Sequence, residues 1–216
     1  MAGILAIDTS TEVCSVAYFE EGILKNIIEE HRRYVHASML APLIKKVLHL
    51  SNVEKPDAIA LSSGPGSYTG LRIGFGTAKG LCYAWDIPLI GISSLLSLAQ
   101  QFNTKADFNV PIMDSRKGEV YAAIYDNKLR KVVEPEPLSV DDLHEKLDVL
   151  KGTIICGGNG AYKLNTDKYK LNNIQMEEVY SSARGLLKVS LRRFEQKRFE
   201  SVFNYKPLYL KQFQSG

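Results

Sequence analysis

The sequence has little of what marks secreted and membrane proteins. Only three of its 216 residues are cysteine, and they lie far apart in the chain, so no disulfide framework is expected. No apolar run approaches the length of a membrane span, and residues 1–7 lack the basic start of a signal peptide. These absences predict a cytoplasmic protein with reduced thiols and no membrane contact.

Strong charge of either sign is also missing. The formal net charge is +3, whereas nucleic-acid-binding domains usually carry a steep basic excess. The charge therefore predicts that any contact with nucleic acid is indirect. With 45% apolar and 24% charged residues, the composition is that of an ordinary globular protein.

Familiar catalytic and metal-binding motifs are absent as well. The four histidines include no pair at helical i, i+3 or i+4 spacing, which metal sites favour. The glycine-rich run at residues 64–70 has neither the ending of a P-loop nor the spacing of a dinucleotide fingerprint, and its serine does not form a nucleophile elbow. We expect no metal, no cofactor and no catalytic nucleophile.

A repeated strand pattern is what the sequence does contain. Three strands are predicted at the start, with Asp8 at their first corner, and three more in the second half, with Asp114 in the equivalent place. The predicted strands cover residues 4–7, 13–19 and 23–28, then 110–113, 119–125 and 131–133, with further strands at 58–61, 88–92 and 153–156. Helical periodicity covers residues 36–48, 67–85, 140–150 and 182–198. The pattern predicts an α/β protein of two similar lobes, 1–104 and 105–216, whose last segment can pack back on the first lobe.

Three loops could bind an anion or a nucleotide. A glycine turn between a strand and a helix directs backbone N–H groups at one spot, and the candidates are Asp8, Gly64, Gly66, Ser67, Gly157, Gly158 and Asn159. The alternative for each loop is a tight turn, which is the simpler interpretation at residues 64–67. Asp8 and Asp114 could hold magnesium or simply form Asx-turns.

The predicted helix at residues 67–85 contains four glycines, namely Gly70, Gly74, Gly76 and Gly80. Each costs a helix about 1 kcal/mol relative to alanine, so something must offset the loss. Either the helix packs closely inside its own lobe, or it forms an intersubunit contact together with the helix at 36–48. The candidate interface residues are His36, Leu40, Leu43, Ile44, Val47, Tyr68, Gly70, Leu71, Gly74, Phe75 and Ala78.

The predicted helix at 182–198 is rich in basic side chains. These are Arg184, Lys188, Arg192, Arg193, Lys197 and Arg198. A solvated face is the simplest interpretation, and a surface for RNA or an acidic partner is the alternative.

Several motifs together point to a known family. The most specific is the run from Gly64 to Gly74, and it is accompanied by Ile4–Ser10, His36–Leu40, Ala78–Gly80, Met113–Tyr121 and the closing Pro207–Lys211. In this combination the chain resembles the bacterial TsaB family, also called YeaZ. The resemblance implies an actin-like ATPase (ASKHA) fold built from duplicated ribonuclease-H-like lobes.

The resemblance also implies a function without catalysis of its own. Such a protein is a scaffold that binds and activates the related subunit TsaD, with the ATPase TsaE completing the assembly. TsaD transfers threonylcarbamoyl to the adenosine 3′ of the anticodon in ANN-reading tRNAs, and the scaffold would meet tRNA only indirectly. The family's interface uses its first two helices, through which the chain could also form a homodimer. An actin-fold ATP-dependent enzyme or a peptidase is the alternative.

One comparison within the resemblance concerns the metal of TsaD. TsaD carries a His-x-x-x-His motif after the strand equivalent to residues 88–92, and in this chain the two positions are Ser94 and Leu98. Neither side chain is a metal ligand in such sites. The resemblance therefore implies a degenerate paralogue that has kept the fold and lost the metal site.

Overall fold

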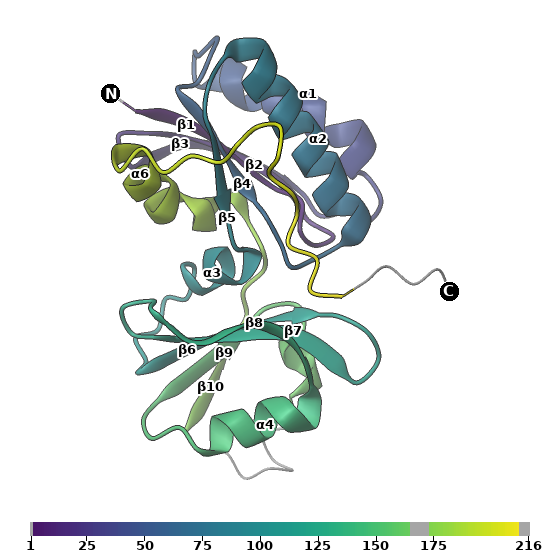
Figure 1. Cartoon of the computed structure of the whole chain (residues 1–216), viewed down its shortest axis with the longest axis vertical. Coiled ribbons are helices and arrows are strands. Elements are labelled where there is room, and N and C mark those ends of the chain that lie inside the picture. The colour runs from purple at the N-terminus through teal and green to yellow at the C-terminus, as the bar shows by residue number, and fades with distance from the viewer. Residues whose placement is uncertain (1, 165–172, 212–216) are drawn as a thin grey trace. The chain divides into compact units, whose positions relative to one another are not determined.

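The first strand, β1 (Gly3–Asp8), is buried along its whole length. Leu5 and Ile7 point into one apolar cluster while Ile4 and Ala6 point into another, because successive side chains of a strand face opposite ways. The computed structural model, whose described residues are 2–164 and 173–211, therefore places helices on both faces of this sheet (Figure 1). Because both faces of β1 are buried, residues 4–7 form one continuous apolar run in the sequence.

The chain divides into two units, each with its own five-stranded sheet. Unit 1 is Met1–Ser97 with Ser181–Tyr209, and unit 2 is Leu98–Tyr180 with Leu210–Gly216. The sequence predicts a boundary at 104/105, whereas the contacts divide the chain at 97/98 and assign residues 181–209 to the first unit.

Unit 1 has the strand order β3-β2-β1-β4-β5. Its strands are β1, β2 (Cys14–Glu20), β3 (Ile23–Glu30), β4 (Ala58–Ser62) and β5 (Leu89–Ile92). Its helices are α1 (His36–Leu50), α2 (Tyr68–Trp85), η2 (Ala183–Leu186) and α6 (Leu187–Glu195). A further helix, α3 (Ser94–Ala99), crosses the boundary between the units. β1 pairs antiparallel with β2 and parallel with β4. Helices α1 and α2 cover one face of the sheet, and α6 covers the other (Figure 1).

Unit 2 repeats this topology with the order β8-β7-β6-β9-β10. The elements are β6 (Phe108–Asp114), β7 (Glu119–Asp126), β8 (Lys131–Ser139), α4 (Val140–Asp148), β9 (Ile154–Gly157), η1 (Ala161–Lys163) and β10 (Ile174–Glu177). β6 pairs antiparallel with β7 and parallel with β9, as β1 does with β2 and β4. The predicted duplication is confirmed, and Asp8 and Asp114 both end the first strand of their sheets.

The late segment is joined to the first sheet by a buried polar network. Glu29 of β3 accepts hydrogen bonds from the hydroxyls of Ser15 (2.8 Å) and Ser182 (2.6 Å), and the backbone N–H of Ala183 donates to Ser15 Oγ (2.9 Å). These bonds seat η2 and α6 on the sheet of unit 1, where Leu186 and Val189 complete the second apolar cluster.

The three cysteines, Cys14, Cys82 and Cys156, are free and buried. Burial raises the pKa of Cys14 to about 11 and that of Cys82 and Cys156 to about 12, so their thiols are weak nucleophiles. Within the described residues, no helix has the length and apolar character needed to cross a membrane.

Candidate functional site

The glycine run packs against the turn between β1 and β2. A Cβ on Gly66 would overlap the carbonyl oxygen of Ser10, and one on Gly70 would overlap that of Thr9. Hydrogen bonds join the same elements, from Ser67 N to Ser10 O (2.7 Å) and from Thr9 Oγ1 to Gly70 O (2.8 Å). The two glycines are needed because helix α2 begins in backbone-to-backbone contact with this turn.

Three of the backbone N–H groups of the run are engaged within unit 1. Gly64 N donates to Ser94 Oγ (3.0 Å), Ser67 N donates to Ser10, and the Ser67 hydroxyl accepts from Gly70 N (3.2 Å) as the N-cap of α2. Pro65 has no N–H to offer. These bonds support the tight-turn interpretation of the run rather than the anion cradle.

Asp8 lies beneath this turn with no exposed surface. Its Oδ1 accepts hydrogen bonds from Ser10 N (2.9 Å) and Ser10 Oγ (2.6 Å), which is an Asx-turn of the kind that the sequence allowed. Burial raises the pKa of the Asp8 carboxyl, although the bonds from Ser10 oppose that rise. A carboxyl in this setting is poorly suited to hold a cation, because burial disfavours its charged form.

Replacing Asp8 by asparagine is expected to stabilise the fold increasingly as the pH rises. Because burial raises the pKa of Asp8 in the folded state, its contribution to stability is complete below the unfolded pKa and is lost as the pH rises through the folded one. Asparagine keeps the acceptor for Ser10 without the charge. Urea unfolding from about pH 4 to about pH 8, followed by fluorescence of the single tryptophan, Trp85, measures the difference. A gain in stability that did not change with pH would contradict the buried-carboxyl interpretation.

The second glycine loop closes on strand β6 in unit 2. Gly160 N donates to Ile112 O (3.0 Å), and Asn159 Oδ1 accepts from Asp114 N (3.0 Å). A Cβ on Gly158 would overlap the carbonyl oxygen of Ile112. Residues 157–160 thus serve as a tight turn, in the same way that the first glycine run does.

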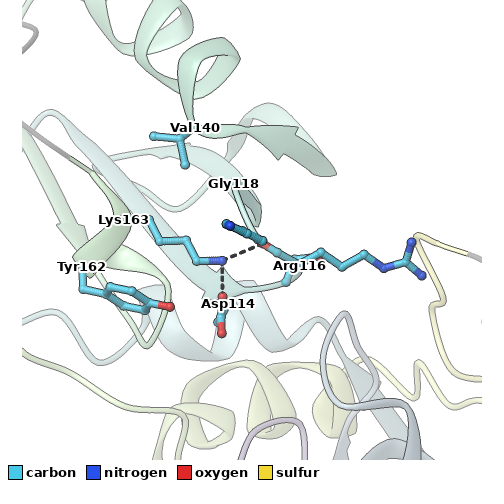
Figure 2. Close-up of a pocket in the computed structure, with 8 residues that line it drawn as sticks. Asp114, Arg116, Gly118, Val140, Tyr162 and Lys163 are labelled. Carbon is cyan, nitrogen blue, oxygen red and sulfur yellow. Dashed lines mark hydrogen bonds and ion pairs between the residues drawn. The ribbon is translucent and has the colours of Figure 1, made fainter. Parts of the chain in front are cut away.

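A surface hollow of about 560 Å³ lies beside this loop in unit 2 (Figure 2). Its lining includes the β6–β7 turn, Val140, Tyr162 and Lys163. The Lys163 ammonium pairs with the Asp114 carboxylate and donates to the carbonyl oxygens of Arg116 (2.8 Å) and Glu119 (2.8 Å). A lysine has three N–H donors, so these three contacts engage all the donors of Lys163. The carboxylate of Asp114 is thereby already paired with a cation.

Lys163 and Tyr162 belong to none of the sequence motifs described above. Lys163 follows Asp114 by almost fifty residues, and only the parallel pairing of β6 with β9 brings η1 to the β6–β7 turn. No motif of short-range spacing could have indicated this ion pair.

The two positions compared with the metal motif of TsaD, Ser94 and Leu98, are both buried. Ser94 Oγ accepts from Ser62 Oγ (2.8 Å) and from Gly64 N, so it holds the glycine turn. Leu98 is fully buried. In the described part of the chain, no three histidine, cysteine, aspartate or glutamate side chains are grouped so that they could hold a metal ion.

Most of the predicted interface residues face the core of unit 1. Leu40, Leu43, Ile44, Val47, Leu71, Phe75 and Ala78 are at most 5% exposed, and His36 is 7% exposed. Gly70 and Gly74 are also buried, and only Tyr68 is half-buried. The apolar periodicity marks the face that each helix turns to its own sheet, so these residues, apart from Tyr68, are turned away from a partner.

The surfaces that α1 and α2 present to solvent consist of other residues. Gly76 and Gly80 are exposed, and nothing lies within 4 Å of a Cβ at either position. Ala37 and Ala41 of α1 are exposed as well. The two pairs of glycines in α2 therefore differ in role. Gly70 and Gly74 serve internal packing, whereas the Cβ positions of Gly76 and Gly80 face open space in the described part of the chain.

Two five-stranded sheets of the same mixed topology, each opening with a three-strand antiparallel meander, define a duplicated ribonuclease-H-like protein of the actin-like ATPase fold. The chain is 33% identical over 219 residues to the tRNA threonylcarbamoyladenosine biosynthesis protein TsaB of Escherichia coli, covering 96% of this chain and 94% of that one. YeaZ from Pseudomonas aeruginosa superposes with a TM-score of 0.82 at 26% identity, covering 96% of this chain and 100% of that one. The chain belongs to the TsaB family.

The likeness extends to the TsaD family. The family model described as TsaD, tRNA N6-adenosine threonylcarbamoyltransferase, matches residues 22–181, so the chain also belongs to this wider family. The tRNA N6-adenosine threonylcarbamoyltransferase of Anaeromyxobacter dehalogenans is 33% identical over 113 residues, covering 44% of this chain and 34% of that enzyme.

Proposed function

We propose that this chain is a non-catalytic scaffold in threonylcarbamoyladenosine modification of tRNA, and that it acts by binding and activating TsaD. The pathway is indicated by the name of the Escherichia coli relative. TsaD is the partner proposed because the chain shares its family and because the resemblance to TsaB implies this partner. TsaE is expected to join the assembly.

The main support for the proposed contact is the pair of exposed glycines in α2. Gly76 and Gly80 lie one turn apart with open space at both Cβ positions, and each costs the helix about 1 kcal/mol of propensity. Internal packing offers no compensation, whereas a partner helix could approach this smooth ridge closely. Ala37 and Ala41 are small, exposed residues of the neighbouring helix α1. The same ridge would serve a homodimer, which would then compete with TsaD.

The non-catalytic assignment is supported by how the two strand-end aspartates are used. Asp8 is buried with Ser10 as its partner, and Asp114 is paired with Lys163. Magnesium binding requires carboxylate oxygens that are open to the ion. The alternative, an ATP-dependent enzyme or a peptidase, would need both groups released from these contacts, and it predicts magnesium–ATP turnover that Asp114→Asn abolishes.

Reconstitution tests the proposed function directly. TsaD, TsaE, tRNA and the threonylcarbamoyl-adenylate source should modify tRNA only when this chain is added, and Asp8→Asn should leave that activity unchanged. Sedimentation of the chain with TsaD should show a complex at micromolar concentration. Full modification without the chain, or no complex with TsaD at that concentration, would overturn the proposal.

A further inference from the structure

The positive charge of the chain is concentrated on one short segment. Residues 184–200 carry six cationic and two acidic side chains. Their net charge of +4 exceeds the +3 of the whole chain, so the remaining residues are slightly acidic. The cations lie on η2, on α6 and in the turn that follows α6.

This segment has a single exposed face. Val189 and Ser190 are buried against the sheet, whereas Arg184, Lys188 and Arg192 recur every four residues on the outside. Successive members are therefore separated by about 6 Å along the axis where the chain is helical. Lys197 and Arg198 continue the exposed face beyond the end of α6. We name these five cations the α6 face.

Internal ion pairs do not account for the α6 face. Among the described residues, none of its five cations forms a salt bridge, while neighbouring Arg193 donates to Gly91 O and approaches Glu200 (3.7 Å). Helix capping explains only part of it, because Arg192 alone of the five lies in the last turn of α6. Cations stabilise the last turn of a helix, but Lys188 lies in the first turn of α6, where the helix dipole opposes it.

A second feature lies at the end of the α6 face. Arg193, Lys197, Arg198, Phe199 and Glu200 line a hollow of about 390 Å³. The ring of Phe199 is 40% exposed and is held edge-on by Phe194, with ring centroids 5.8 Å apart. Cations beside a fixed, accessible aromatic ring are the means by which proteins hold unpaired nucleotides.

We propose that the α6 face binds the phosphate backbone of tRNA directly, and that the hollow at Phe199 receives one unpaired nucleotide. An acidic protein partner fits less well, because protein interfaces are centred on apolar side chains and are depleted in lysine, while the residues that line the hollow are charged except for Phe199. The α6 face lies on the side of the sheet opposite to α1 and α2 (Figure 1). One chain can therefore contact tRNA and a helical partner at once. The inference relies on the proposed function for the identity of the RNA.

Two variants of equal charge test the inference. One is Lys188→Gln with Arg192→Gln and Arg198→Gln, and the matched control is Lys105→Gln with Lys128→Gln and Lys151→Gln, all exposed lysines of unit 2. Fluorescence anisotropy of labelled ANN-reading tRNA is measured with the full chain, alone and with TsaD, over a salt series. The α6-face variant should bind at least about 10-fold more weakly, with the slope of log Kd against log salt reduced by about 2 to 3. The control should stay within about 2-fold of the wild type.

Sedimentation of each variant with TsaD separates this inference from the proposed function. Intact association with weakened tRNA binding supports the α6 face as an RNA contact. Equal weakening by both variants, unchanged binding by the α6-face variant, or no tRNA binding by the wild-type chain in either form would overturn the inference. Loss of TsaD or TsaE association with tRNA binding unchanged would also overturn it, and would assign the face to a protein. Circular dichroism verifies that both variants are folded.

Discussion

Replacing Gly70 by alanine is expected to lower the free energy of unfolding of unit 1 by about 3 kcal/mol, whereas Gly76→Ala should raise it by about 0.5 to 1 kcal/mol. The two substitutions are chemically identical and lie in the same helix. They differ in what the new methyl group meets, which is the carbonyl oxygen of Thr9 at position 70 and open space at position 76. At position 70 neither partner can yield by rotating a side chain, because the contact is with backbone on a buried turn.

Urea unfolding followed by the fluorescence of Trp85 measures this pair of variants. Trp85 is the only tryptophan and packs against the cluster formed by α1, α2 and the first sheet, so its signal reports on unit 1 even if unit 2 unfolds separately. Equal effects of the two substitutions would contradict the close approach of α2 to the β1–β2 turn. Such a result would also mean that all four glycines of α2 have the same role.

The double variant Gly76→Leu with Gly80→Leu is expected to abolish detectable association with TsaD while leaving the chain folded. Two leucine side chains would stand on the ridge that a partner helix must approach, and open space surrounds the Cβ position at both sites among the described residues. Interhelical contacts built on small residues do not tolerate such bulk. The association constant should fall at least about 100-fold, which corresponds to about 2.8 kcal/mol.

Sedimentation with TsaD and circular dichroism together measure this effect. The matched control is the alanine pair, Gly76→Ala with Gly80→Ala, which removes the flexibility of glycine but adds little volume, and which should retain most of the association. A folded leucine variant that still bound TsaD as tightly as the wild type would exclude this ridge as the contact. The same variant should be monomeric if the ridge also forms a homodimer.

The fold was largely predictable because the strands and helices of each lobe leave local patterns in the sequence. The buried strands are short apolar runs bounded by polar turns, and the order of strand meander, helix and strand occurs twice. The predicted helix at 67–85 is α2 within one residue. Strand β10 (Ile174–Glu177) was not predicted, because its half-exposed side chains give an edge strand little apolar pattern.

The candidate sites were less predictable, because periodicity identifies the face of a helix that is buried without saying what buries it. Leu40 and Phe75 form conspicuous apolar stripes with their neighbours, and the stripes turned out to pack on the domain's own sheet. The exposed Gly76 and Gly80 stand apart from the buried Gly70 and Gly74 only once the helix has been placed on that sheet. The phase of the glycines relative to the apolar stripe was the signal that could have separated them.

The sequence by itself determined the family and the doubled α/β plan, because motifs and strand patterns are local properties of the chain. Only the tertiary structure decided what the loops and charges do. Gly64–Ser67 became a turn closed by Ser10 and Ser94, and Asp114 acquired Lys163 as its partner, since both depend on segments brought together across a sheet. The net charge of the whole chain is too mild to indicate RNA binding, and only the structure shows that several cations share one face of α6. They lie on that face because the opposite face of the helix is apolar and packs on the first sheet.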